Sequence, residues 1–385
     1  MPSDRPQLAA LTSLRFITAL HVFFFHIEAA HIVYAPNPAQ LVASIGYVGV
    51  NWFFLLSGFI LAYSYAGRTI SLSDFWRARF VRIYPAYFVA LCLAAPLFLY
   101  VCFYTPLTAE QNWIAAMRDH IFSYTFLALV LMQAWIPAAA LSVNPVGWSL
   151  SVEAFFYVLF PLLLPALTRL SQRNLVFLLL ALSLVSVAMA QGYVVISPDG
   201  IAHVTPDMNN LPWLNVLRFN PLVRLPEFLI GVCGGLLYLK QPLPTRWAMP
   251  LVAGGLTVYS IANLLCDQIP YPVMHNGLLS LPFMAIIYGI ALRPWWAYIL
   301  EWRPFQMLGE ISYSFFLTHG IVIALFFRPD GTPSPQHSII EIWLCLAVAI
   351  AIAFGLYHGV EQPMRRRFSQ SKAKMQPKPE VPNGN

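Results

Sequence analysis

The feature that most constrains this chain is a series of long, nearly uncharged apolar runs joined by short polar connectors. Hydrophobic residues make up 59% of the 385 residues and charged residues only 10%, whereas soluble domains carry about 25% charged residues. A soluble fold could not bury so much apolar surface, so we expect lipid around the chain. Because the runs are continuous and do not alternate, they indicate helices and exclude a β-barrel. The sequence therefore predicts an all-α integral membrane protein.

The apolar runs predict a bundle of ten transmembrane helices, because a helix needs about 20 apolar residues to cross a bilayer. One further apolar stretch, Ile121–Trp135, is too short to be assigned as a span. The ten expected ranges are 11–33, 46–66, 83–104, 148–168, 174–193, 221–239, 247–265, 276–292, 308–327 and 339–358.

Basic connectors predict the orientation of the bundle, because Lys and Arg collect in cytoplasmic loops. Five basic clusters follow the second, fourth, sixth, eighth and tenth spans: Arg68, Arg77, Arg79 and Arg82; Arg169 and Arg173; Lys240 and Arg246; Arg293 and Arg303; and Arg365, Arg366, Arg367, Lys372 and Lys374. They share one side only if Ile121–Trp135 does not cross. We therefore predict a re-entrant or interfacial helix there, on the outer side, and place both termini in the cytoplasm.

A single membrane domain is expected over residues 1–368, followed by a polar cytoplasmic tail, 369–385, whose composition predicts disorder. The first apolar run carries four ionisable residues, so we expect a retained helix and not a cleaved signal peptide. The five cysteines include no CxxC pair, so we predict neither a disulfide framework nor a metal site. The net charge of +6 is assigned to topology, and no nucleic-acid partner is expected.

Ionisable residues within a bilayer are costly and mark candidate functional sites. Arg15 and His26 lie eleven positions apart on the first helix, so they share a face and are about 16 Å apart along the axis. Arg15 is expected near the inner surface and His26 in the outer half of the membrane. A hydrogen-bonded histidine between helices is the ordinary alternative for His26.

The fourth helix carries Glu153 about one turn from its outer end, with Ser149 and Tyr157 on the same face. On the ninth helix, Ser312 and His319 are seven positions apart and also share a face, with His319 in the middle or outer half. A structural carboxylate and a polar contact in the core are the ordinary alternatives for Glu153 and His319.

Two pairs of charged residues have a spacing that places both members on one helical face. Arg224 and Glu227, near the outer end of the sixth helix, form either an intrahelical ion pair or the wall of a site. Arg79 and Arg82 lie at the inner side, where arginine suits bidentate recognition of a polyphosphate arriving from the cytoplasm. They also serve as topology signals and as contacts for phospholipid headgroups.

Six segments, taken together and in this order, resemble the acyltransferase-3 family of membrane acyltransferases over about residues 8–368. They are Arg15 and His26 with ten residues between them, VNWFFLLSGFILA, the RFVR of Arg79–Arg82, WSLSVE ending at Glu153, LGEISYSFFLTHG and VEQP. Two positions depart from the family pattern, Thr318 where an aromatic residue is common and Gln362 where a basic one is. They weaken what the resemblance implies for His319 and for VEQP.

The resemblance implies transfer of an acyl group, most often acetyl, from cytoplasmic acyl-coenzyme A to a hydroxyl of an envelope or exported glycan or another small molecule. It implies functional roles for Arg15, His26, Arg79 and Arg82. It also implies a bacterial inner membrane as the location, with membrane lipids as neighbours, and leaves open a separate extracytoplasmic partner that completes the transfer. Acyl-coenzyme A would be a donor substrate, and no tightly bound cofactor is expected.

These observations combine in one mechanistic hypothesis, in which arginines hold the charged end of coenzyme A and the thioester reaches the outer-half residues. His26 would act as general base or briefly accept the acyl group, oriented by Glu153 or His319. A secondary transporter and a non-catalytic assembly subunit of a cell-envelope machine remain alternatives. The predicted site comprises His26, Glu153 and His319 as catalytic residues, Arg15, Arg79 and Arg82 for the donor, and Ser149, Arg224, Glu227 and Ser312 as acceptor-side or structural residues.

Overall fold

The computed structural model describes residues 5–29, 44–104, 112–327 and 339–375, which are mostly helical and contain no strand. Ten helical segments in this part are long and apolar enough to cross a membrane, which confirms the predicted all-α fold. They are formed by α1 (Ala9–Ala29), η1 and α3 (Gly46–Val48 and Gly49–Tyr65), α4 (Leu72–Tyr104), η5 and α7 (Pro145–Gly147 and Trp148–Arg169), α8 (Gln172–Ile196), α9 and α10 (Pro212–Phe219 and Pro221–Lys240), η6 and α11 (Thr245–Trp247 and Ala248–Leu264), α12 and α13 (Tyr271–His275 and Ser280–Ala291), α14 (Arg303–Phe327), and α15 with η8 and α16 (Ile339–Leu356, Tyr357–Glu361 and Gln362–Met375).

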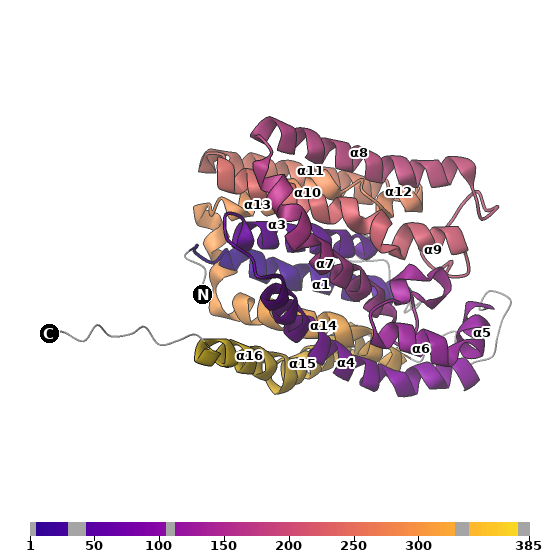
Figure 1. Cartoon of the computed structure of the whole chain (residues 1–385). Coiled ribbons are helices and arrows are strands. Elements are labelled where there is room, and N and C mark those ends of the chain that lie inside the picture. Colours follow the sequence, from indigo (N-terminus) through magenta and orange to yellow (C-terminus); the bar gives the residue numbers. More distant parts are fainter. Residues whose placement is uncertain (1–4, 30–43, 105–111, 328–338, 376–385) are drawn as a thin grey trace.

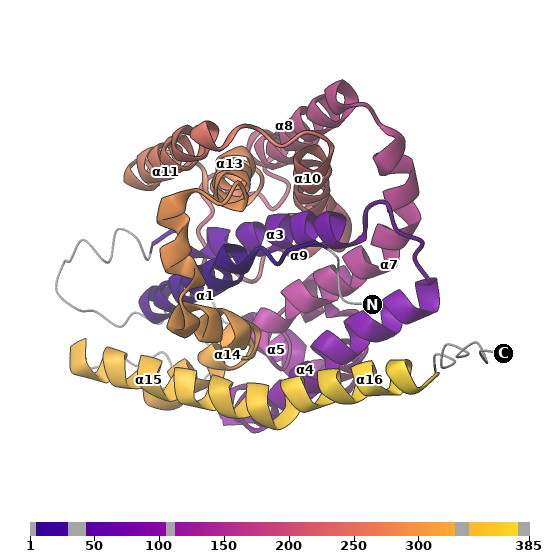
Figure 2. The ribbon, with the colours of Figure 1, turned by 90° about the vertical axis from the view of Figure 1, so that its left-hand side faces the viewer.

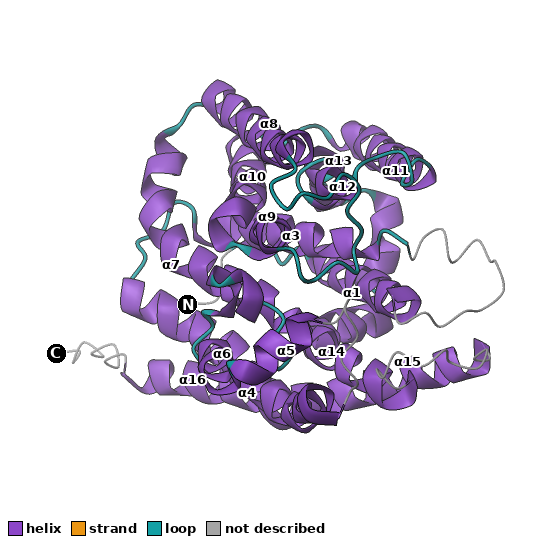
Figure 3. Ribbon diagram, turned by 90° about the vertical axis from the view of Figure 1, so that its right-hand side faces the viewer, coloured by secondary structure: helices purple, strands orange, loops and turns teal. Residues whose placement is uncertain are grey.

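Ten crossings bring the start of α1 and the helix α16 to the same end of the bundle, which we call the N-terminal face (Figure 1). The short helices α5 (Asn112–Asp119), α6 (Ile121–Leu129), α9 and α12 lie at the other end, which we call the opposite face (Figure 3). The apolar stretch predicted not to span, Ile121–Trp135, thus forms α6 and the 3-10 turn η3 (Gln133–Trp135), and a second turn, η4 (Pro137–Ala139), follows it. None of these is among the ten segments.

The centre of the bundle contains two tightly packed helix pairs, α3 with α10 and α1 with α14 (Figure 2). Glycines permit the close approach of both. A Cβ on Gly231 of α10 would lie 2.0 Å from the carbonyl oxygen of Leu55, and one on Gly309 of α14 would lie 2.3 Å from that of Thr12. These backbones could not approach so closely with any larger residue.

The outer helices expose large apolar side chains, as expected for a surface in contact with lipid. On α8, for example, Phe177 and Leu184 are 73% and 70% exposed. The helix α4 begins at Leu72 and not at residue 83, so Arg79 and Arg82 lie on a continuous helix that extends from the N-terminal face.

The last helix changes its winding where it passes the centre of the bundle. A π-helical turn, Tyr357–Glu361, joins α15 to α16, and such turns are found frequently at functional sites. It leaves Tyr357 and Glu361 buried, at 5% and 3% exposure. The helix α16 continues to Met375, into the segment for which disorder was predicted, and residues 376–385 lie outside the described part.

Candidate active site

A cavity of about 400 Å³ lies between α1, α3, α4, α7, α14 and the π-helical turn. Its lining begins at the N-terminal face with Pro6 and Tyr63 and extends to Val50 and Phe316 near the middle of the bundle. Six of the ten predicted site residues line it: Arg15, Arg79, Arg82, Ser149, Glu153 and Ser312. The structure therefore brings together residues from four separate helices that the sequence could only place by depth.

Two arginines bring positive charge to the cavity. Arg15 and Arg82 are partly buried and have neither a hydrogen bond nor an ion pair with any residue in the described ranges. Arg79 is held more firmly, because its Nη2 donates to the hydroxyl of Tyr65 at 3.3 Å and its guanidinium lies 5.6 Å from the ring centroid of Phe75. The two unpaired guanidinium groups are thus available to an anion.

The carboxylates of the cavity are engaged by hydroxyl groups and leave these arginines without direct partners. Glu153 accepts from Ser57 at 3.1 Å and from Tyr157, Glu361 from Ser314 at 3.0 Å, and Glu310 from Tyr357 at 3.2 Å. One ion pair, between Arg365 and Glu361 at 3.5 Å, contributes to this wall. A partly buried guanidinium without a direct carboxylate partner favours binding of a negatively charged ligand.

Beyond the cavity, His26 and His319 form a hydrogen-bonded pair with 3.1 Å between His26 Nδ1 and His319 Nε2. The backbone carbonyl oxygen of Val22 lies 2.9 Å from His26 Nδ1, and that of Phe316 lies 2.8 Å from His319 Nδ1. A carbonyl oxygen can only accept a hydrogen bond. Both Nδ1 atoms are therefore assigned as protonated, and His319 Nε2 accepts from His26. This leaves the lone pair of His26 Nε2 without a partner among the described residues.

The histidine pair lies deeper than the cavity, about 16 Å from Arg15 along α1. Phe316 belongs to the lining of the cavity, and its ring centroid lies 5.7 Å from that of His319. Phe53, also in the lining, contacts Phe316 with 5.5 Å between ring centroids. Phe316 thus contacts both the cavity, which it lines, and His319 of the histidine pair.

The structure places the other predicted residues of the cavity in different roles. Glu153 shares no hydrogen bond with the histidines in the described part, since its partners are Ser57 and Tyr157. Ser149 and Ser312 line the cavity, but each donates to a carbonyl three residues earlier, at 2.9 and 2.7 Å. Of the two groups proposed to orient His26, the structure places His319 against it and Glu153 elsewhere.

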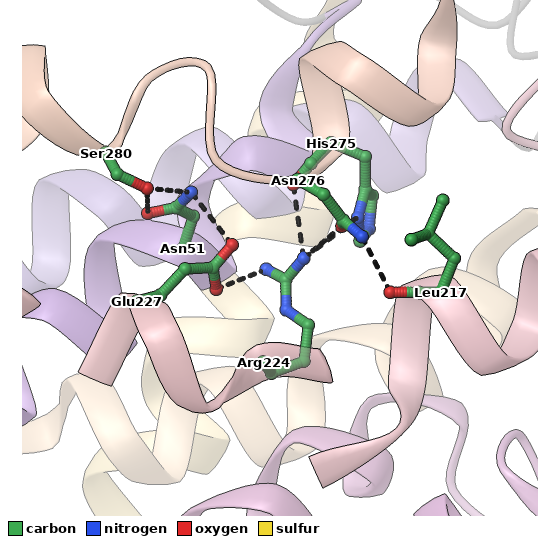
Figure 4. A network of polar contacts seen from close by, with 7 residues as sticks. All are labelled: Asn51, Leu217, Arg224, Glu227, His275, Asn276 and Ser280. Atoms are coloured by element: carbon green, nitrogen blue, oxygen red, sulfur yellow. Dashed lines mark hydrogen bonds and ion pairs between the residues drawn. The ribbon is translucent and has the colours of Figure 1, made fainter. Parts of the chain in front are cut away.

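Arg224 and Glu227 lie outside the cavity lining, in a buried polar network (Figure 4). Their side chains are 1% exposed and paired at 2.8 Å. Arg224 donates to the carbonyl oxygen of His275 at 3.2 Å and to Asn276 Oδ1, and Glu227 accepts from Asn51 at 3.1 Å. This network connects α3, α10 and α12. Of the two roles considered for Arg224 and Glu227, the structure therefore favours the ion pair over the wall of a site.

Several of these contacts have no signal in the sequence, because the partners are far apart along the chain. Asn51 meets Glu227 across 176 positions, and Arg224 meets His275 across 51. Glu361 and Arg365 follow the last predicted span, and the π-helical turn that presents them has no hydropathy signature. Within the described ranges, no group of three His, Cys, Asp or Glu residues is placed to hold a metal ion.

A multi-pass helical bundle with an arginine-lined cavity and a hydrogen-bonded histidine pair defines the class of protein. The sequence model of the acyltransferase-3 family, described as an acyltransferase domain, matches residues 8–358. The chain therefore belongs to this family and is a membrane acyltransferase, which confirms the resemblance seen in its motifs.

Named relatives agree with this assignment. The acyltransferase MdmB of Streptomyces mycarofaciens is 29% identical over 398 residues, which cover 97% of this chain and 95% of MdmB. The O-acetyltransferase OatA of Staphylococcus aureus is 24% identical over 383 residues, which cover 94% of this chain but 57% of OatA. No solved structure matches the chain.

Proposed function

We propose that this protein transfers an acyl group, acetyl in the first instance, from cytoplasmic acyl-coenzyme A to a hydroxyl of an envelope or exported glycan. The observation that carries the proposal is the pair of arginines without direct partners in a cavity whose lining reaches Phe316, one helical turn from the His319 that bonds to His26. The family and the relative named as an O-acetyltransferase support an oxygen acceptor. They also favour an enzyme over the transporter and the assembly subunit.

The cavity suits a donor with one charged end and one long flexible arm. The phosphate groups of coenzyme A pair with Arg15 and Arg82 near the N-terminal face, and Arg79 forms part of the cavity wall beside them. The arm extends along α1 toward His26, past the contact between Phe53 and Phe316. We assign the N-terminal face to the cytoplasm because the basic connectors collect there, and a bacterial inner membrane is the proposed location.

The histidine pair can then perform the transfer. His26 Nε2 takes the proton of the acceptor hydroxyl while the oxygen of that hydroxyl attacks the thioester carbonyl. The carbon–sulfur bond then breaks, and the proton passes from His26 to the departing coenzyme A thiolate. His319 accepts the hydrogen bond from His26 Nδ1 and holds the ring in this tautomer. A two-step route, in which Nε2 first carries the acyl group, uses the same lone pair. Delivery of the product by a separate extracytoplasmic partner is compatible with either route.

The test compares the purified wild type with His26→Ala and with His21→Ala in nanodiscs. His21 is the matched control, because it lies on the same helix but within 3.1 Å of the hydroxyl of Tyr259 and outside the cavity. Labelled acetyl-coenzyme A is supplied with a crude envelope glycan extract, and free coenzyme A and labelled glycan are measured. We expect transfer by the wild type and His21→Ala and none by His26→Ala. Equal transfer by all three would remove His26 as the base, and coenzyme A release without any acylated product would remove the proposed transfer.

A further inference from the structure

The connection between α6 and α7, residues 130–147, is partly buried and is strained at two positions. Leu131 and Val143 have positive φ angles of 58° and 61°, and this conformation is rare for any residue but glycine and especially for a β-branched one. Connections usually run over the surface, where water satisfies their polar groups. Strain of this kind persists only where the surrounding structure enforces it, and it gathers at functional sites.

Two polar side chains anchor this connection to neighbouring helices in an ordinary way. Gln133, 1% exposed, donates to the hydroxyl of Tyr87 on α4 at 3.0 Å and to the carbonyl oxygen of Gly147 at 2.9 Å. Ser151 on α7 donates to the carbonyl oxygen of Leu131 at 2.6 Å. These bonds fix both ends of the connection against α4 and α7.

Asn144 does something different, because its side chain reaches the helix that carries His319. Asn144 is the N-cap of the turn that leads into α7, a position where asparagine commonly bonds to its own helix, yet it makes no such bond. Its Nδ2 instead donates to the carbonyl oxygen of Leu317 on α14 at 3.0 Å, and the residue is 2% exposed. The residue immediately before it is the strained Val143.

We infer that Asn144 is a positioning residue for the histidine pair. Leu317 lies between Phe316, whose carbonyl fixes the Nδ1 proton of His319 at 2.8 Å, and His319 itself. Holding the Leu317 carbonyl therefore holds the helical turn that directs His319 Nε2 toward His26. The catalytic consequence rests on the proposed function, whereas the orientation of His319 does not.

The test uses Asn144→Asp, which keeps the size of the side chain but removes the donor, and Asn144→Ala, which leaves the Leu317 carbonyl its helical bond. Ser142→Ala is the matched control, because Ser142 is 1% exposed in the same connection and bonds to the carbonyl oxygen of Tyr124 at 3.3 Å. Nitrogen-15 NMR of histidine-labelled protein in nanodiscs reports the tautomer of each ring, and His319→Asn identifies the His319 signals.

We expect wild type and Ser142→Ala to show His319 protonated at Nδ1, and both Asn144 variants to show a mixture of tautomers. Their kcat falls about tenfold, equivalent to one lost orienting bond, while KM for acetyl-coenzyme A is unchanged because Asn144 does not line the cavity. A wild-type spectrum with His319 protonated at Nε2 would overturn the inference, even if neither Asn144 variant folds. So would Asn144 variants that match Ser142→Ala in spectrum and kcat. A wild type without transfer activity would refute the proposed function, and the spectra would still decide the orientation.

Discussion

Replacing Arg82 with alanine is expected to weaken the binding of coenzyme A without destabilising the protein. A charge-assisted hydrogen bond contributes about 1.5–3 kcal/mol, which corresponds to about a 10- to 150-fold increase in Kd. Arg82 has no ion pair within the described residues, so its removal leaves no carboxylate there without a direct partner. The loss therefore falls on the ligand and not on folding.

Arg77→Ala is the matched control for this experiment. Arg77 lies on the same helix but is exposed, outside the cavity lining and 5.9 Å from the ring centroid of Phe368. Arg82→Lys keeps the charge but not the planar guanidinium, so its dissociation constant for coenzyme A should fall between those of Arg82→Ala and Arg77→Ala. Coenzyme A without an acyl group is titrated calorimetrically into protein in nanodiscs at fixed ionic strength, which avoids turnover and keeps screening constant.

Equal dissociation constants for Arg82→Ala and Arg77→Ala would contradict this expectation, because they would show that the cavity arginine does not contact the donor. A large loss of thermal stability in Arg82→Ala would refute the second part, namely that Arg82 has no structural partner. Weaker binding at an unchanged melting temperature is the result that the geometry requires.

Three further predictions concern the histidine pair and the packing. His319→Ala should lower kcat about 10- to 100-fold with unchanged coenzyme A binding, and steady-state kinetics with equal kcat would contradict this. Gly255→Ala places a Cβ 2.6 Å from a backbone carbonyl oxygen of α13 and should destabilise the protein by about 1–3 kcal/mol. Its neighbour Gly254→Ala places a Cβ that meets nothing within 4 Å and should be neutral or stabilising. Equal shifts of the two variants in thermal unfolding would contradict the packing of α11 against α13. Glu227→Gln should cost about 3–5 kcal/mol, and the double variant with Arg224→Met should recover part of it; additive losses would show that the pair is not coupled.

The sequence predicted the bundle well because lipid imposes a local rule that each span obeys by itself. A run of about 20 apolar residues becomes a helix whatever its neighbours are. The same logic placed Arg15, Arg79 and Arg82 toward one face of the membrane, and the cavity collects all three. Depth along a helix is readable from spacing and from basic connectors.

Lateral contacts were not readable, because they depend on which helices are neighbours and how each is rotated. Glu153 and His26 were expected at similar depth, yet they lie on α7 and α1 and share no hydrogen bond in the described part. His319 meets His26 across 293 positions, and only the packing of α14 along α1 brings them together. Asn144 carried no signal at all, since an asparagine before a proline indicates a turn and not a contact with α14.

The most direct test of the account is the sidedness of the transfer. The wild type and His26→Ala are reconstituted in sealed vesicles with the N-terminal face outward, and envelope glycan is enclosed in the lumen. Labelled acetyl-coenzyme A, which does not cross a bilayer, is then added outside. We expect free coenzyme A outside and labelled glycan inside for the wild type, and neither for His26→Ala. Transfer only when the donor is enclosed in the lumen would contradict the account, because the charged cavity would then lie on the wrong side of the chemistry.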